Sequence, residues 1–336
     1  MKIGVLGAGT WGMALSTLLA KNGHQVVVWS AIADEIDRLV ATRTHANLPG
    51  IVFPEELSYT KDIEKACEGQ EMILFVVPSA FIRSTTAKAA RFIPENAILV
   101  NASKGIEQGT LKTMTEVMED ELMAVRPTLK HRVAALSGPT HAEEVARGIP
   151  TSIVSACDDE QTSLEIANVF FNSCLRVYTN TDVLGVELCG ALKNIIAIAA
   201  GILRGMGYGD NTLAMLMTRG ISEMTRIGVA MNCNRGTFMG LAGIGDLIVT
   251  CTSVHSRNNR CGELIGKGMT YEQAAAEIGM VVEGYHALGA AIELSQKYGV
   301  EMPITSAVYD IIKKRRAPED AMRELMNRNI KNELEF

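Results

Sequence analysis

Residues 1–30 have the sequence MKIGVLGAGTWGMALSTLLAKNGHQVVVWS. The apolar run at 2–6 predicts a buried strand, the spacing of 12–21 predicts a helix, and the valine-rich run at 25–29 predicts a second strand. Between strand and helix lies the pattern G-x-G-x-x-G, formed by Gly7, Gly9 and Gly12. The first glycine permits a tight turn, the second lets a pyrophosphate approach the backbone, and the third lets helix and strand pack closely. The stretch therefore predicts a dinucleotide-binding unit.

The residues after the second predicted strand do not distinguish between NAD and NADP. An acid at this place often bonds the ribose 2′-hydroxyl of NAD, whereas a base often meets the 2′-phosphate of NADP. The chain has Ser30, Ala31 and Ile32 there, and the nearest acid is Asp34. We expect Asp34 to cap the following helix, so the choice between NADH and NADPH stays open.

Similar apolar runs continue along the first half of the chain. They lie at 72–77, 97–101, 133–136, 152–155 and 176–178, and helical segments separate most of them. Such runs predict a parallel-rich sheet buried on both faces, an α/β arrangement of the Rossmann type. After residue 182 the pattern becomes helical, with segments expected at 183–204, 211–231, 257–266, 270–277, 283–298, 304–314 and 317–328. We therefore expect a Rossmann-like domain over 1–185 and an all-α domain over 186–336.

Composition narrows the classes of partner and compartment. The net charge is −6, which leaves no basic surplus for the phosphate backbone of a nucleic acid. The seven cysteines have no zinc-site or redox spacing, and the six histidines show no metal pattern, so we assign no metal and expect reduced, mostly buried thiols. The apolar segment 194–203 is bounded by Lys193 and Arg204 and is too short to span a membrane. A cytoplasmic protein is the expectation.

Two polar loops follow predicted strands. Lys104 comes after the strand at 97–101, while Gly138 and Thr140 come after the strand at 133–136. Open α/β sheets bind ligands at the carboxyl ends of their strands, so these residues are candidates for a binding site. Thr140 is also a candidate cap for the next helix. The alternative for Lys104 is a solvated loop lysine.

Lys193 lies within an apolar helical segment, and Gly190, Ala197 and Gly201 share its helix face. Small neighbours leave room for a ligand beside the ammonium. Burial tends to lower the pKa of a lysine, which suits it to proton transfer near neutral pH. The alternative is a lysine that extends from a domain interface to solvent.

The glycine-rich stretch 240–246 differs from the first because its surroundings are helical. It can bring Asp246 and Thr250 close to other groups. A helix is expected to begin after Ser256, its N-cap, so that Arg257 and Asn258 lie in its first turn. A helix N-terminus that carries an arginine is suited to a phosphate monoester.

Together these motifs closely resemble the NAD(P)-dependent glycerol-3-phosphate dehydrogenases of the bacterial type. The match runs from the first glycine loop to the stretch 301–304, through the motifs around Lys104, Gly138, Lys193, Asp246, Ser256 and the stretch 281–284. The resemblance implies a C-terminal domain like that of 6-phosphogluconate dehydrogenase. It also implies reduction of dihydroxyacetone phosphate to sn-glycerol 3-phosphate for phospholipid synthesis, by a homodimer.

The resemblance also implies roles for individual residues. Lys193 is the acid/base, and Lys104 and Asp246 complete the catalytic set. The cofactor set comprises Gly7, Gly9, Thr10, Trp11, Gly12, Lys104, Ala142, Arg257, Val281 and Glu283. The substrate set comprises Lys104, Gly138, Thr140, Lys193, Asp246, Ser256, Arg257 and Asn258.

The sequence departs from the family at Ala31, where members commonly have an arginine or histidine that can meet the 2′-phosphate of NADPH. Two other hypotheses remain at this point. One is a β-hydroxyacid dehydrogenase of the 6-phosphogluconate type, and the other is a non-catalytic dinucleotide-sensing protein. The anion-binding stretch 256–258 favours a phosphorylated substrate over a hydroxyacid, and Lys193 together with Asp246 disfavours a sensor.

Overall fold

A computed structural model describes residues 1–128, 131–330 and 332–333. The chain forms two compact units, each with its own core. The α/β unit consists of Met1–Lys104 and Thr113–Val183, and the helical unit consists of Gly105–Lys112 and Leu184–Phe336. The segment Gly105–Lys112 thus leaves the first unit and contributes to the second, an excursion that the expected division at 185 and 186 does not contain.

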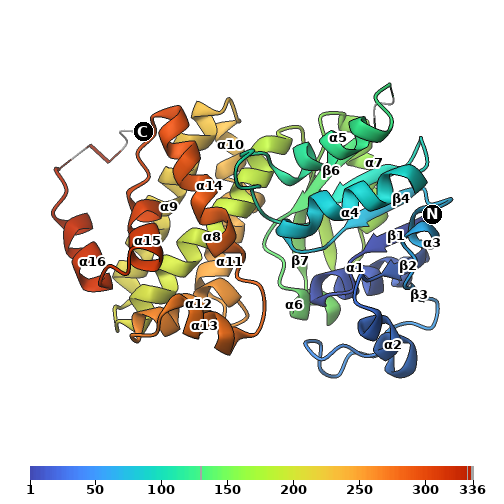
Figure 1. The fold of residues 1–336 in the computed structure, drawn as a ribbon, viewed down its shortest axis with the longest axis horizontal. Helices are drawn as coiled ribbons and strands as arrows, with labels where there is room; N and C mark the ends of the chain where they lie inside the picture. Colours follow the sequence, from blue (N-terminus) through green and yellow to red (C-terminus); the bar gives the residue numbers. More distant parts are fainter. Residues whose placement is uncertain (129–130, 331, 334–336) are drawn as a thin grey trace. The chain divides into compact units, whose positions relative to one another are not determined.

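The α/β unit is built on one eight-stranded sheet in the order β3-β2-β1-β4-β5-β6-β7-β8 (Figure 1). All neighbouring strands are parallel except β6 and β7, which are antiparallel. The strands are β1 (Lys2–Leu6), β2 (Gln25–Trp29), β3 (Ser58–Thr60), β4 (Met72–Phe75), β5 (Ile98–Asn101), β6 (Arg132–Ser137), β7 (Thr151–Ala156) and β8 (Leu175–Asn180).

The predicted parallel-rich sheet is confirmed, with two differences. The strand β3 was not predicted, because its three residues are too few and too exposed to form an apolar run. The reversal between β6 and β7 was not predicted either. The connection between these strands contains only the five-residue helix α6 (Ala142–Ala146), which is much shorter than the helix of a usual parallel crossover.

Helices cover both faces of the sheet, which explains why its central strands β1, β4 and β5 are almost continuously apolar. One face packs against α1 (Thr10–Lys21), α2 (Ala33–Thr42), α6 and α7 (Glu160–Phe170). The other face packs against α3 (Ile63–Cys67), α4 (Ile82–Ala89) and α5 (Met114–Val125). Two short 3-10 turns, η1 (Ser79–Phe81) and η2 (Ala90–Phe92), flank α4.

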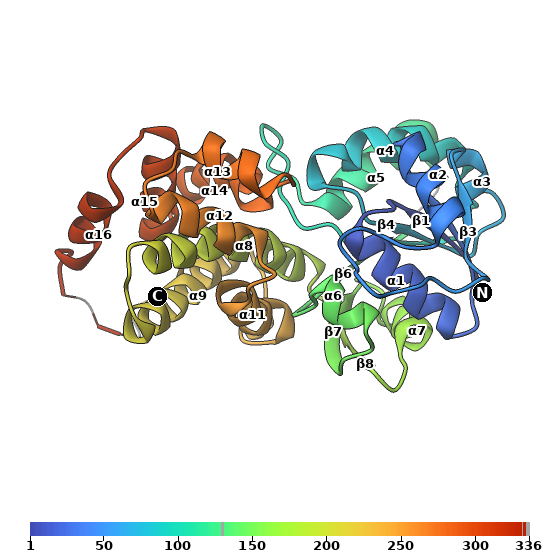
Figure 2. The same ribbon diagram turned by 90° about the horizontal axis from the view of Figure 1, so that it is seen from below.

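The helical unit is organised around α8 (Val183–Gly205), which is buried from Gly185 to Leu203 (Figure 2). Its other helices are α9 (Asp210–Ala230), α10 (Arg235–Phe238), α11 (Asp246–Thr252), α12 (Arg257–Gly266), α13 (Tyr271–Ile278), α14 (Glu283–Tyr298), α15 (Pro303–Lys313) and α16 (Pro318–Met326). The predicted helices of this half are confirmed within a few residues at each end. The helices α10 and α11 are new, because a glycine-rich stretch hides such short elements.

By length and composition alone, α8 is apolar enough to cross a membrane. Its most apolar window, however, is entirely buried inside the unit, as in a core helix. The apolar segment 194–203 is only part of this helix, which is longer and includes Glu187 and Lys193 within its buried stretch. Six of the seven cysteine side chains are also buried, as expected.

Candidate functional site

The three glycines of the first loop have three different environments. Gly7 has φ +129°, and a Cβ there would lie 2.5 Å from the carbonyl oxygen of Val76. A Cβ on Gly12 would collide with the carbonyl oxygen of Gly7, so this glycine permits close packing of α1. A Cβ on Gly9 would meet nothing within 4 Å. The open space beside Gly9, at the N-terminus of α1, fits a dinucleotide pyrophosphate.

The residues after Gly9 begin α1, with Gly9 itself as N-cap. The Thr10 hydroxyl accepts a hydrogen bond from the Asn47 side-chain amide at 3.2 Å, and Trp11 is half-buried in the same turn. Ala142 begins α6, which packs against α1. The predicted cofactor residues Thr10, Trp11 and Ala142 therefore lie in the first turns of two helices that pack against each other.

The loops after β5 and β6 meet at the carboxyl ends of these strands. The Lys104 ammonium donates a hydrogen bond to the Gly138 carbonyl oxygen at 3.2 Å, and the Thr140 hydroxyl donates to the same oxygen at 3.1 Å. The structure thus brings Lys104, Gly138 and Thr140 together. The expectation that Thr140 caps α6 is wrong, because His141 is the N-cap and the Thr140 hydroxyl bonds back to its own loop.

The expected capping role of Asp34 is also wrong. Ile32 is the N-cap of α2, without a side-chain cap, and Asp34 lies inside the first turn. The acid that the structure brings to the end of β2 is Glu35, whose carboxylate accepts a hydrogen bond from the Ser30 hydroxyl at 2.6 Å. Sequence reasoning missed this contact because only the serine turn after the strand brings the two side chains together.

In the helical unit, Lys193 is buried together with two polar partners. Its ammonium donates to the Asp246 carboxylate at 2.6 Å and to the Thr250 hydroxyl at 2.6 Å. Lys193, Asp246 and Thr250 are only 5%, 1% and 4% exposed. The expected burial of Lys193 is confirmed, as is the expectation that the glycine-rich stretch brings Asp246 and Thr250 close to another group.

The helix α11 presents both partners on one face. Asp246 and Thr250 are four residues apart, and the Thr250 hydroxyl also donates to the Asp246 backbone oxygen at 2.6 Å. A π-helical turn, Leu241–Gly245, leads directly into Asp246. Such turns are rare in proteins, and those that occur are often found at functional sites. The Asp246 carboxylate favours the charged ammonium, which opposes the effect of burial on Lys193.

The small residues beside Lys193 were expected to leave room for a ligand, but not all of them do. A Cβ on Gly201 would collide with the backbone of α12 at Asn259. This glycine therefore allows α8 and α12 to touch, and the expectation is wrong at Gly201. The physical reason is that small residues serve close helix packing as readily as ligand binding.

Two hydrogen bonds of the Asn258 side chain tie α8, α12 and α14 together. The Asn258 side-chain amide donates to Asn194 at 2.9 Å, and the Asn258 side-chain oxygen accepts from the backbone N–H of Gly284 at 2.9 Å. Ser256 caps α12 as expected, accepting from the backbone N–H of Asn259 at 3.2 Å. Glu283 begins α14, directly after Val281 and the N-cap Val282. The predicted residues Ser256, Asn258 and Glu283 thus gather at the N-termini of α12 and α14.

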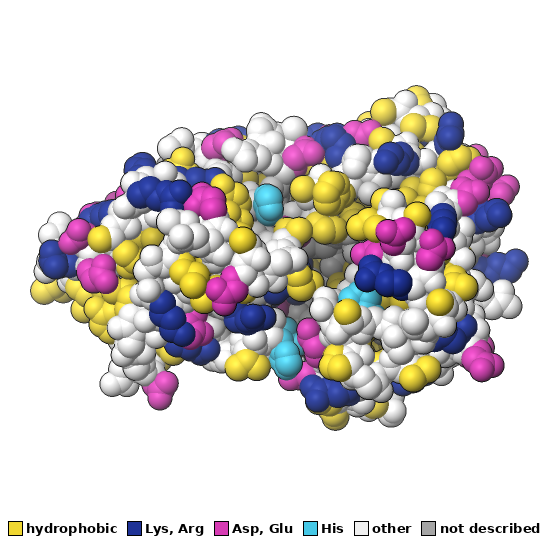
Figure 3. Space-filling view, turned by 60° about the horizontal axis from the view of Figure 1, so that its bottom comes forward, with side chains coloured by type: hydrophobic (Ala, Val, Ile, Leu, Met, Phe, Trp, Pro, Cys, Tyr) yellow, Lys and Arg dark blue, Asp and Glu magenta, His cyan; other side chains and the backbone are white. Residues whose placement is uncertain are grey.

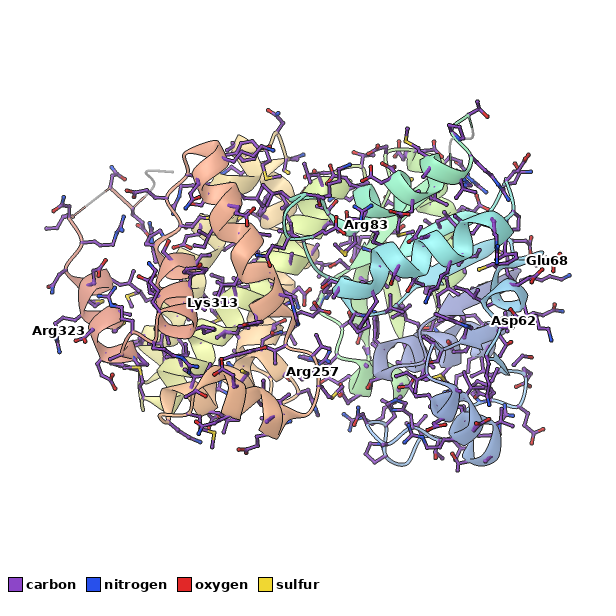
Figure 4. The ribbon with its side chains drawn as sticks, viewed as in Figure 1. Asp62, Glu68, Arg83, Arg257, Lys313 and Arg323 are labelled. Atoms are coloured by element: carbon purple, nitrogen blue, oxygen red, sulfur yellow. The ribbon has the colours of Figure 1, made fainter. Side chains whose placement is uncertain are left out.

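Arg257 lies in the first turn of α12 and is half-buried (Figure 4). Within residues 1–128, 131–330 and 332–333, no carboxylate forms an ion pair with its guanidinium. The guanidinium therefore has no carboxylate partner in the described chain. A phosphate group here could accept charge-assisted hydrogen bonds from the guanidinium, and the helix N-terminus also favours its negative charge. On the face seen in Figure 3, by contrast, Lys and Arg side chains are interspersed with Asp and Glu.

A dinucleotide loop in an α/β unit, combined with a buried lysine–carboxylate pair in a helical unit, defines a nicotinamide-dependent oxidoreductase. The family model of the NAD-dependent glycerol-3-phosphate dehydrogenase N-terminus matches residues 2–163, and that of the C-terminus matches residues 182–323. The chain belongs to the NAD-dependent glycerol-3-phosphate dehydrogenase family and is an NAD(P)-dependent enzyme.

Individual relatives agree over nearly the whole chain. It is 53% identical over 333 residues to glycerol-3-phosphate dehydrogenase [NAD(P)+] 2 of Lactobacillus delbrueckii subsp. bulgaricus, covering 99% of each chain. It is 45% identical to glycerol-3-phosphate dehydrogenase [NAD(P)+] of Fusobacterium nucleatum, covering 100% of this chain and 99% of that one. The crystal structure of glycerol-3-phosphate dehydrogenase from Coxiella burnetii matches with a TM-score of 0.92 at 37% identity, over 97% of this chain and 99% of that chain.

These findings decide between the hypotheses that the sequence left open. They favour a glycerol-3-phosphate dehydrogenase over a β-hydroxyacid dehydrogenase of the 6-phosphogluconate type and over a non-catalytic sensor.

Proposed function

We propose that the chain reduces dihydroxyacetone phosphate to sn-glycerol 3-phosphate with NAD(P)H, in a reversible reaction. The observation that carries this proposal is the ammonium of Lys193, held 2.6 Å from both Asp246 and Thr250 in a buried site. Membership of the dehydrogenase family supports the same reaction.

In this proposal Lys193 is the general acid. When bound, the nicotinamide supplies the hydride that reduces the ketone carbon. Charge then develops on the carbonyl oxygen, and the Lys193 ammonium donates a proton to it, giving the alcohol. Asp246 and Thr250 orient the ammonium, and Asp246 stabilises its positive charge before transfer. In the reverse direction the neutral amine accepts the hydroxyl proton.

The phosphate of the substrate is assigned to the N-terminus of α12. Arg257 provides the charge, and Ser256 and Asn258 flank it in the same first turn. We assign Lys104, Gly138 and Thr140, with Lys193 and Asp246, to the rest of the substrate and its carbonyl end. Lys104 also meets the cofactor, as the family resemblance implies.

The cofactor is assigned to the glycine loop and to the start of α14. The open backbone at Gly9 fits the pyrophosphate, and Gly9 is the N-cap of α1, against which α6 packs. The proposed set comprises Gly7, Gly9, Thr10, Trp11, Gly12, Lys104, Ala142, Arg257, Val281 and Glu283.

The family resemblance also supports proposals for the compartment, the oligomeric state and the metabolic role of the protein. We infer a cytoplasmic homodimer that supplies the glycerol phosphate backbone of phospholipids, with domains 1–185 and 186–336. A groove of about 920 Å³ supports the homodimer. Its apolar lining comes mainly from α8, α9, α15 and α16 and does not include Lys193 or Asp246. Exposed apolar side chains such as Met215 and Met326 line it and would be covered by a second copy.

Steady-state kinetics test the proposed reaction. We expect NAD(P)H oxidation with dihydroxyacetone phosphate, and glycerol 3-phosphate as the product. Dihydroxyacetone without phosphate tests the role of Arg257 and should be a much poorer substrate. Turnover of a β-hydroxyacid, with none of dihydroxyacetone phosphate, would reject the proposal. Light scattering after size-exclusion chromatography tests the homodimer.

A further inference from the structure

The carboxyl end of β2 holds a fixed carboxylate. The backbone N–H of Gly7 donates to the Trp29 carbonyl oxygen at 2.9 Å, so the end of β2 lies beside the glycine turn. The next residue, Ser30, is only 6% exposed. Its hydroxyl accepts from the backbone N–H of Ile32 at 3.1 Å and donates to the Glu35 carboxylate at 2.6 Å. Ser30 thus anchors Glu35 next to the dinucleotide loop.

The two residues that follow Ser30, Ala31 and Ile32, are uncharged and exposed. Ala31 is exposed and has only a methyl group, and Ile32 is 56% exposed. The turn that Ser30 makes with Ile32 places these two residues at the surface and leaves Glu35 half-buried behind them. The negative charge nearest the buried Ser30 hydroxyl is therefore the Glu35 carboxylate.

A carboxylate at the end of the second strand discriminates between the two nicotinamide dinucleotides. It can accept a hydrogen bond from the ribose 2′-hydroxyl of NAD(H), and it repels the 2′-phosphate of NADP(H). We propose that Glu35, positioned by Ser30, makes this chain prefer NAD(H) over NADP(H). This inference rests on the cofactor site of the proposed function and specifies its ligand.

Arg38 is the residue that would favour the opposite preference. It lies one turn further along α2, is exposed, and donates through its guanidinium Nε to the Asp34 carbonyl oxygen of its own helix at 3.3 Å. Burial lowers the pKa of the nearby His45, and the charges of Glu35 and Arg38 act on it in opposite directions. Ser30 fixes Glu35, whereas within residues 1–128, 131–330 and 332–333 the guanidinium of Arg38 is held only by its own helix, so Glu35 is assigned the dominant role.

Equilibrium binding tests the proposal without relying on turnover. The chain has two tryptophans, Trp11 in the glycine loop and Trp29 at the end of β2, so quenching of tryptophan fluorescence gives the dissociation constants of NADH and NADPH. We expect NADH to bind the unmodified protein about tenfold or more tightly than NADPH, as for one charge-assisted hydrogen bond.

Three variants identify the residue responsible. Glu35→Gln should reduce the preference for NADH by about tenfold, mainly by strengthening NADPH binding. Ser30→Ala should reduce it in the same direction by a smaller factor, because the carboxylate loses its anchor. Asp34→Asn is the matched control: it removes the same charge from the adjacent position and should leave the ratio unchanged.

Equal or tighter binding of NADPH by the unmodified protein would overturn the proposal. A Glu35→Gln ratio equal to that of Asp34→Asn would overturn it as well. Arg38→Ala tests the alternative that Arg38 binds the 2′-phosphate of NADPH. A large loss of NADPH affinity in that variant would support this alternative and overturn the proposal. If the NADH preference depends on Glu35 but dihydroxyacetone phosphate is not reduced, the proposed reaction fails while this inference stands.

Discussion

Lys193 and Asp246 form an ion pair at 2.6 Å, although 53 residues separate them in the sequence and both are almost completely buried. Removing two charges from water costs free energy that their attraction often does not recover. A buried pair is thus weak evidence for stability, and buried ionisable groups cluster at active sites. The pair is best explained by the chemistry assigned to Lys193.

We expect Lys193→Ala to lower kcat by about 10²- to 10⁴-fold, because the proton donor is lost. The affinity for NADH should stay largely intact, since Lys193 is not among the residues proposed to hold the cofactor. Stopped-flow turnover and fluorescence titration measure the two quantities. Lys267→Ala, which removes an exposed lysine paired with Glu263, is the matched control. An unchanged kcat in Lys193→Ala would refute the mechanism.

The ion pair also predicts a pattern of stabilities. Asp246→Asn leaves the Lys193 ammonium buried without its carboxylate and should lower the free energy of unfolding by about 3–5 kcal/mol. The double variant Lys193→Met, Asp246→Leu removes both charges and should be more stable than Asp246→Asn. Urea denaturation monitored by circular dichroism measures each variant. A double variant that is no more stable than Asp246→Asn would contradict this account of the pair.

Arg257 should control substrate affinity. We expect Arg257→Ala to raise the KM for dihydroxyacetone phosphate by about 10- to 100-fold, because a charge-assisted contact to phosphate is lost. Arg260, three residues further along α12 and exposed, provides the control, and Arg260→Ala should leave KM unchanged. Similar KM values for the two variants would remove Arg257 from the phosphate site.

Glu223 gives the helical unit a predicted pH dependence. Burial raises the pKa of its carboxyl to about 7, although the backbone N–H groups of Ile304 and Thr305 at the start of α15 donate to it and oppose the shift. A raised pKa means that the folded state binds the proton more tightly than the unfolded state. This contribution is present below pH 4.5 and is lost as the pH rises to about 7.

Its size, from the shift in pKa, is on the order of 3 kcal/mol. Glu223→Gln should therefore flatten the decline in stability between these pH values, as measured by urea denaturation across the range. Glu263→Gln, a surface carboxylate paired with Lys267, should leave the decline unchanged. The assignment to Glu223 fails if both variants keep the slope of the unmodified protein.

The sequence predicted best what depends on local patterns. The glycine loop, the buried strands and the long helices follow from spacing within one segment, and their positions were confirmed within a few residues. The Ser256 cap is similarly local. The short elements β3 and α11 were missed because a few residues do not form a recognisable periodic pattern.

Contacts over long sequence separations were beyond local patterns. Lys193 was predicted to be buried, but its pairing with Asp246 depends on how α8 and α11 pack. The role of Gly201 was predicted wrongly because the sequence does not show that α12 lies against it. Glu35 was overlooked because its approach to Ser30 depends on the turn after β2.

The excursion of Gly105–Lys112 makes the helical unit discontinuous in the chain. Ile106, from this segment, is 4% exposed and belongs to the core of the helical unit, and Gln108 lies against Gly289 of α14. A polypeptide that begins at residue 184 would lack both contacts, with an uncovered patch in its core. A single crossover near residue 184 between two relatives would therefore pair the core of the helical unit with the Gly105–Lys112 segment of the other parent.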